Sequence, residues 1–128
     1  MLKTGESAET YLETILVLSK TKNTVRSIDI ANELEYSKPS VSIAMKNLRE
    51  NGHITVDEDG HITLTQSGLK IAESIYERHS VISDFLKSLG VDAKTAINDA
   101  CRIEHVISEQ SFEKLSNHYK HLTANKCE

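Results

Sequence analysis

Residues 27–64 read SIDIANELEYSKPSVSIAMKNLRENGHITVDEDGHITL, and this stretch decides the fold. Apolar residues recur every three or four positions over 27–35 and again over 38–51, which predicts two helices separated by a tight break. From 53 to 64 the period changes to two, with polar residues Asp57–Gly60 at the centre. The stretch therefore predicts a helix-turn-helix followed by a β-hairpin.

Residues at the ends of these two helices support their boundaries. Ser27 and Ser37 are N-cap candidates, because a serine oxygen can accept a hydrogen bond from a free N–H of the first turn. Pro39 falls in the first turn of the second helix, where a missing N–H is harmless. Gly52 follows as the glycine that ends a helix.

The helical period also extends on both sides of this stretch. The pattern predicts one helix before it, over 7–20 with Ser7 as cap, and three after it: 67–89, 92–107, and a last helix to about Leu122 with a frayed tail. The expected fold class is mainly α with a small β-hairpin. We expect an N-terminal winged helix-turn-helix domain at 1–66 and a helical domain at 67–128.

Composition is that of a globular protein. The 128 residues are 38% hydrophobic and 27% charged, with a formal net charge of −4. No apolar run has the length of a membrane span and no signal peptide is recognisable, so we expect a cytoplasmic protein. Two cysteines, Cys101 and Cys127, are not expected to form a disulfide there.

The second helix of the helix-turn-helix has a surface suited to DNA. The short hydroxyls of Ser40 and Ser42 can approach base edges closely, and Lys46 and Arg49 suit phosphates. The segment 38–49 is locally basic although the chain is acidic. Serines are also common on solvated helix surfaces, so these residues alone leave both interpretations open.

The second half of the chain offers metal ligands. Cys101, Glu104 and His105 lie at i, i+3 and i+4, which places a thiol, a carboxyl group and an imidazole on one helix face. His79 interrupts an apolar stripe, and Glu13 on the first helix is a further candidate. Spacing alone leaves the ordinary alternatives open: a small apolar cysteine, a surface Glu–His pair and a hydrogen-bonded core histidine.

Four segments resemble the diphtheria toxin repressor/manganese transport regulator family of metal-dependent repressors. They are AETYLETILVL, the turn SKPSVS, the hairpin with its continuation HITVDEDGHITLT-QSG, and above all DACRIEHVIS with its C-x-x-E-H motif. The likeness covers about residues 6–120. It implies the short branch of the family, which lacks a third, SH3-like domain, and a helical half that forms the dimer.

The resemblance implies roles for particular residues. The metal ligands would be Glu13, His79, Cys101, Glu104 and His105, and the residues that face bases would be Ser37, Pro39, Ser40 and Ser42. Three positions depart from the family pattern: Thr10 stands where Met or Asp is usual, Ser83 where an acidic ligand is often found, and Cys101 where manganese regulators have Glu. A thiolate favours Fe²⁺ over Mn²⁺, so the sequence leaves the metal open between these two.

The resemblance therefore implies a homodimeric repressor that binds a palindromic operator in double-stranded DNA, with Mn²⁺ or Fe²⁺ as corepressor. Metal-uptake genes are the expected targets. Two alternatives remain: a winged-helix regulator that senses redox state through Cys101 or a small ligand, and a small helical metalloenzyme. Beyond the Cys101, Glu104 and His105 cluster, no additional acid–base group or substrate pocket supports the enzyme.

Overall fold

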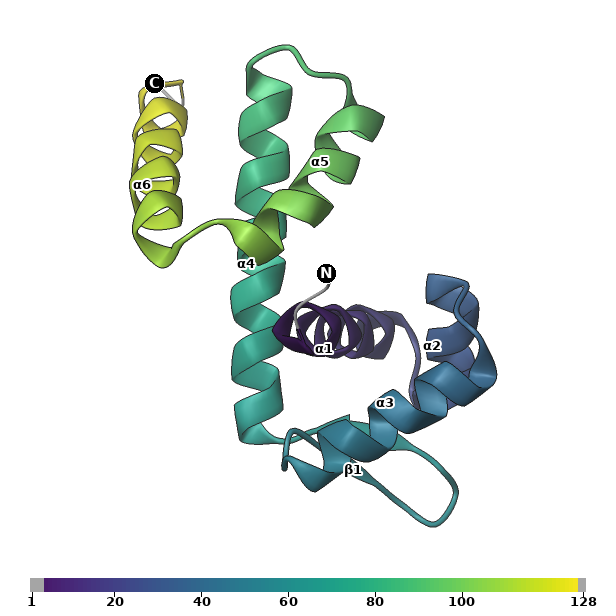
Figure 1. Ribbon diagram of the computed structural model, residues 1–128. Coiled ribbons are helices and arrows are strands. Elements are labelled where there is room, and N and C mark those ends of the chain that lie inside the picture. The colour runs from purple at the N-terminus through teal and green to yellow at the C-terminus, as the bar shows by residue number, and fades with distance from the viewer. Residues whose placement is uncertain (1–3, 127–128) are drawn as a thin grey trace. The chain divides into compact units, whose positions relative to one another are not determined.

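The computed structural model describes residues 4–126, together with the side chains of 8–122, and separates the chain into two compact units. The first unit extends to Ser74 and the second begins at Ile75. The described chain contains six helices and two strands in the order α1, α2, α3, β1, β2, α4, α5, α6 (Figure 1). The expected class, mainly α with one small hairpin, is confirmed.

The first unit is a helix-turn-helix with a hairpin. It comprises α1 (Thr4–Thr21), α2 (Ser27–Leu34), α3 (Lys38–Glu50), β1 (Ile54–Val56), β2 (Ile62–Leu64) and the start of α4 (Gln66–Ser88). The strands are antiparallel, with Thr55 opposite Thr63. The N–H of Ile62 donates to the carbonyl of Val25 at 2.7 Å, so the hairpin is also tied to the loop before α2.

One core holds the first unit together. Leu12 of α1, Ile30 of α2, Val41 of α3 and Ile54 of β1 are each at most 2% exposed and belong to a single apolar cluster. The period of two in the hairpin is confirmed, because Ile54 and Ile62 are buried while Thr55 and Thr63 are exposed. Each of these elements turns its apolar face to the shared core, and this fixes how α3 is oriented within the first unit.

Gly68 permits a close approach within the first unit. A Cβ at this position would collide with the backbone carbonyl of His53, which itself accepts a hydrogen bond from the N–H of Thr65 at 3.0 Å. Only a residue without a side chain fits there. Gly68 therefore sets how closely the beginning of α4 packs beside the hairpin.

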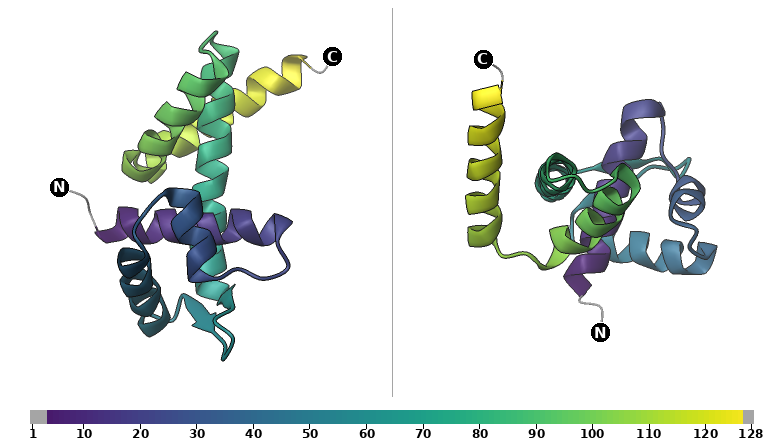
Figure 2. Two further views of the ribbon diagram at one scale, coloured as in Figure 1. Left: turned by 90° about the vertical axis from the view of Figure 1, so that its right-hand side faces the viewer. Right: turned by 90° about the horizontal axis from the view of Figure 1, so that it is seen from above.

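The second unit contains the rest of α4 with α5 (Ala93–Val106) and α6 (Glu109–Lys126). Asp92 is the N-cap of α5, the position at which the sequence predicts this helix to start, and it accepts hydrogen bonds from the backbone N–H and the hydroxyl of Thr95. The backbone N–H of Thr95, with its hydroxyl, lowers the pKa of Asp92. α5 crosses α4 at an angle (Figures 1 and 2). Ile82 of α4 and Ala96 and Ala100 of α5 are buried.

Several expected helix ends were wrong. α1 begins at Thr4, so Ser7 is inside the helix and is not its cap. Ser27 is the first residue of α2, whose N-cap is Arg26; the backbone N–H of Arg26 donates to the Asp29 carboxylate at 2.9 Å. The last helix continues to Lys126, beyond the expected end at Leu122. Cys127 lies outside the described residues.

Candidate metal centre and DNA-binding surface

Three of the expected metal ligands meet inside the second unit. His79 comes from α4, and Cys101 and Glu104 come from adjacent turns of α5. The Nδ1 atom of His79 lies 2.9 Å from Oε1 of Glu104 and 3.8 Å from Sγ of Cys101. One ligand atom from each residue lies within 4.8 Å of the other two. A nitrogen, a sulfur and an oxygen donor are therefore close enough to share one cation.

Glu104 is the buried centre of this group. The residue is 1% exposed, and its Oε1 accepts a hydrogen bond from the His79 ring in the tautomer that protonates Nδ1. Its Oε2 is also buried and has no hydrogen-bond partner among the described residues; Nε2 of His105 lies 3.4 Å from it. A buried carboxylate oxygen without a donor is costly. A bound cation would satisfy it, so the residues fit a metal.

Cys101 is exposed. The alternative that this cysteine is a small apolar core residue therefore does not hold, since its side chain lies at the surface beside His79. Sulfur at an accessible position is available as a ligand once it is deprotonated. The alternative of a purely surface Glu–His pair does not hold either, because Glu104 is buried.

Arg78 is a residue of this site that the sequence analysis missed. Its Nη1 donates to the backbone carbonyls of Glu104 at 3.3 Å and Ile107 at 3.1 Å, and its guanidinium lies 5.5 Å from the centre of the Phe112 ring. It thus satisfies carbonyls at the end of α5, which have no partners within the helix. Arg78 and the adjacent His79 hold the backbone and the side chain of Glu104 respectively.

Glu13 and Thr10 lie on α1, in the first unit. Glu13 is half-buried, and the carbonyl of Thr10 accepts a hydrogen bond from the hydroxyl of Thr14 at 2.8 Å. That Glu13 is a metal ligand, and whether Thr10 contributes, stay predictions. Ser83, another position that departs from the family pattern, is 4% exposed on α4.

The outward face of α3 carries the expected DNA-binding residues. Val41, Met45 and Leu48 are buried, which turns the opposite face of the helix to solvent. The exposed residues include all six that the sequence analysis selected: Ser37, Pro39, Ser40, Ser42, Lys46 and Arg49.

The hydroxyl of Ser37 has a structural role on this face. As N-cap it accepts from the Ser40 N–H at 3.3 Å, and it donates to the Ser40 hydroxyl at 2.8 Å. Tyr36, just before it, is 47% exposed and makes an edge contact with Tyr11, with ring centres 5.9 Å apart. Burial of Tyr11, and secondarily the Tyr36 hydroxyl, raises the pKa of Tyr11.

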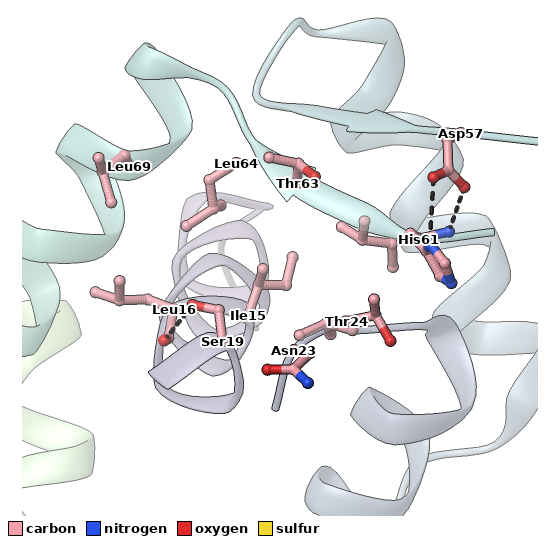
Figure 3. Close-up of a pocket in the computed structure, with 12 residues that line it drawn as sticks. Ile15, Leu16, Ser19, Asn23, Thr24, Asp57, His61, Thr63, Leu64 and Leu69 are labelled. Carbon is pink, nitrogen blue, oxygen red and sulfur yellow. Dashed lines mark hydrogen bonds and ion pairs between the residues drawn. The ribbon is translucent and has the colours of Figure 1, made fainter. Parts of the chain in front are cut away.

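The polar residues at the tip of the hairpin form a hydrogen-bonded turn. Asp57 accepts hydrogen bonds from the backbone N–H groups of Asp59 and His61 and faces the His61 ring at 3.2 Å (Figure 3). The backbone N–H of His61 in particular lowers the pKa of Asp57. A guanidinium only donates, so Nε2 of His61, 3.0 Å from Arg26, accepts.

A groove of about 430 Å³ runs from this tip along α1 (Figure 3). Apolar residues line one part of it, among them Ile15 and Leu64, and polar residues such as Asn23 line the other. It does not include any residue of α3. The groove is therefore separate from the surface that carries the expected DNA-binding residues.

Comparison with known proteins identifies the family. The model of the N-terminal DNA-binding domain of iron-dependent repressors matches residues 3–62, and the model of their metal-binding and dimerisation domain matches residues 65–128. An HTH-type transcriptional regulator of Methanocaldococcus jannaschii is 34% identical over 113 residues, covering 87% of this chain and 90% of the relative. The chain belongs to the iron-dependent repressor family.

Other relatives and solved structures are also similar to this chain. The HTH-type transcriptional regulator MntR of Bacillus subtilis is 31% identical over 89% of this chain and 80% of its own length. The solved structure of the manganese regulator SloR is 29% identical with a TM-score of 0.78, and that of ScaR with bound Zn²⁺ is 28% identical with a TM-score of 0.75. Each covers 88% of this chain, which spans 53% of theirs.

Membership confirms the predicted class of function. Members of the iron-dependent repressor family are metal-dependent, DNA-binding transcriptional repressors, so this protein is a regulator and not an enzyme. A divalent metal, DNA and a second copy of the chain are the partners that its two domains imply. No helix among residues 4–126 has an apolar stretch long enough to cross a bilayer.

Proposed function

We propose that this repressor is a cytoplasmic homodimer that senses Mn²⁺ or Fe²⁺. With metal bound, it binds a palindromic operator and represses metal-uptake genes. We assign DNA binding to residues 1–66 and metal binding with dimerisation to 67–128. One observation carries the proposal: Glu104 is buried between His79 and His105 with an oxygen that lacks a hydrogen-bond partner.

The proposed ligands are His79, Cys101, Glu104 and His105 of the second unit, together with Glu13 of α1. A divalent ion would supply the positive charge that offsets the buried carboxylate. The donor set mixes imidazole, carboxylate and thiol groups, which suits middle and late divalent transition metals. The thiol of Cys101 favours Fe²⁺ over Mn²⁺ within that range. The structure of the similar protein ScaR contains bound Zn²⁺, a late divalent metal.

The proposed DNA contacts follow from the face of α3. Ser37, Pro39, Ser40 and Ser42 lie at its N-terminal end, where short side chains let the helix approach base edges. Lys46 and Arg49 lie one to two turns later and suit phosphates. A dimer that reads a palindrome presents its two recognition helices about 34 Å apart, one turn of DNA.

Metal and DNA are expected to strengthen each other's binding. A ligand shifts a conformational equilibrium only by its difference in affinity for the two states. If the loaded protein binds DNA more tightly, DNA must tighten metal binding by the same factor, typically about 5–150-fold.

The test begins with in vitro selection of a duplex by the protein in the presence of Mn²⁺. Fluorescence anisotropy then gives the dissociation constant with Mn²⁺, with Fe²⁺ under anaerobic conditions, and after chelation. The proposal expects chelation to weaken binding at least fivefold. His105→Ala should bind DNA weakly even with metal, whereas His121→Ala, which alters an exposed histidine of α6, should behave as wild type.

Two results would contradict the proposal. Equal DNA binding before and after chelation would show that metal does not control the protein. Release of DNA by oxidation of Cys101, with no effect of chelation, would support the redox alternative instead.

A further inference from the structure

We propose that Ile43 is a specificity-determining residue that reads the 5-methyl group of a thymine in each operator half-site. The inference rests on the proposed function, because it requires α3 to enter the major groove. Ile43 is 63% exposed, more than any other large hydrophobic residue described in the first unit. It is also absent from the expected set of DNA-binding residues, all of which are polar apart from Pro39.

The position of Ile43 places it at the centre of the outward face of α3. Ser40 lies three residues before it and Lys46 three residues after it, so all three share one side of the helix. The buried residues Val41 and Met45 fix that side toward solvent. A β-branched side chain has few rotamers in a helix, so Ile43 presents its methyl groups in a defined direction.

The chemistry of the groove then selects the partner. Isoleucine neither donates nor accepts hydrogen bonds, so it gains nothing from the polar edges of adenine, guanine or cytosine. Thymine alone presents an apolar group in the major groove, the methyl at C5. An aliphatic side chain exposed on an otherwise polar recognition face is complementary to that methyl. Removal of one buried methyl corresponds to a loss of about fourfold in affinity per half-site.

The experiment replaces single thymines by deoxyuridine, which lacks only the methyl. The duplex is the one selected with Mn²⁺, and each thymine is exchanged in turn in both half-sites. Dissociation constants are measured for wild type, Ile43→Ala and Ile43→Val. Val17→Ala is the matched control, because Val17 is an aliphatic residue of α1 that is 39% exposed. Circular dichroism checks that each variant is folded.

The proposal expects one sensitive thymine in each half-site. Replacing that thymine by deoxyuridine should weaken DNA binding by the wild type about fourfold for each half-site changed. Ile43→Ala should bind the thymine duplex at least fourfold more weakly and be indifferent to deoxyuridine at that position. Ile43→Val, which keeps a branched aliphatic group, should retain part of the sensitivity, and Val17→Ala all of it.

Two outcomes overturn the inference while leaving the proposed function intact. In one, wild type binds the duplex in a metal-dependent manner but no thymine is sensitive to loss of its methyl. In the other, the same thymine remains sensitive in Ile43→Ala, which assigns the contact to another residue. Failure of wild type to select any duplex with metal overturns the proposed function and this inference together.

Discussion

Replacement of Glu104 by glutamine separates a metal-binding role from a structural one. Glu104→Gln keeps the shape of the side chain and a hydrogen bond to His79, but it removes the negative charge. In the metal-free protein the change leaves a neutral amide where a buried carboxylate oxygen lacks a hydrogen-bond partner. Because a neutral amide is easier to bury than a carboxylate with one oxygen that lacks a donor, we expect the free energy of unfolding to change by no more than about 1 kcal/mol.

The effect of metal should differ sharply between the two proteins. At a metal concentration of about 100 times its dissociation constant, wild type gains about 2.7 kcal/mol. For a chain of this size that corresponds to roughly 10 °C in Tm. If loss of the carboxylate weakens binding about 100-fold, the same concentration stabilises Glu104→Gln by only about 0.4 kcal/mol, or roughly 2 °C.

Thermal unfolding followed by circular dichroism measures both effects, since the chain has no tryptophan to report by fluorescence. Wild type, Glu104→Gln and the control Glu77→Gln, an exposed glutamate of α4, are compared with Mn²⁺ and with chelator. Two results refute the reasoning. One is a full metal-induced shift in Glu104→Gln. The other is a metal-free variant destabilised by about 3 kcal/mol or more, the signature of a broken structural ion pair.

Three further predictions test other parts of the structure. Cys101→Ser should abolish the thiolate-to-Co²⁺ charge-transfer absorption of the Co²⁺-loaded protein; an unchanged spectrum removes Cys101 from the ligand set. Gly68→Ala should lower the free energy of unfolding by about 1–3 kcal/mol in chemical denaturation, because its Cβ meets the His53 carbonyl, whereas Ser74→Ala on the same helix should be nearly neutral. Lys46→Ala should reduce the slope of log K against log salt by about 1 per subunit; an unchanged slope shows that Lys46 contacts no phosphate.

Local rules predicted most of the fold. Ser37, Gly52 and Asp92 act at helix ends by interactions within a few residues, and each does what its sequence position indicates. At α2 the rule failed because two capping arrangements competed. The Asp29 carboxylate accepts the N–H of Arg26, so the helix begins one residue earlier than a Ser27 cap predicts.

The candidate site was predictable where its residues share a helix. Spacing alone places Cys101 and Glu104 on one helix face. His79 was a candidate ligand because it interrupts an apolar stripe. The role of Arg78 was not predictable, because its partners are backbone carbonyls 26 and 29 residues later, which no sequence pattern marks. Nor does spacing reveal exposure: Cys101 is at the surface while Glu104, three residues on, is buried.

The hydrogen bonds around Glu104 bear on how metal can control DNA binding. Arg78 donates to its backbone carbonyl and the His79 ring lies 2.9 Å from its carboxylate, so α4 and α5 already bring these donor atoms together inside the second unit. An ion bound only by such a preformed set would have the same affinity with and without DNA, and a ligand with equal affinity for two states shifts neither. Regulation therefore requires a contribution to the metal affinity that changes when the DNA-binding unit binds DNA. The predicted ligand Glu13 meets this requirement, since it belongs to α1 of that unit. Glu13→Gln should accordingly retain metal binding at the second unit and lose the dependence of DNA binding on metal.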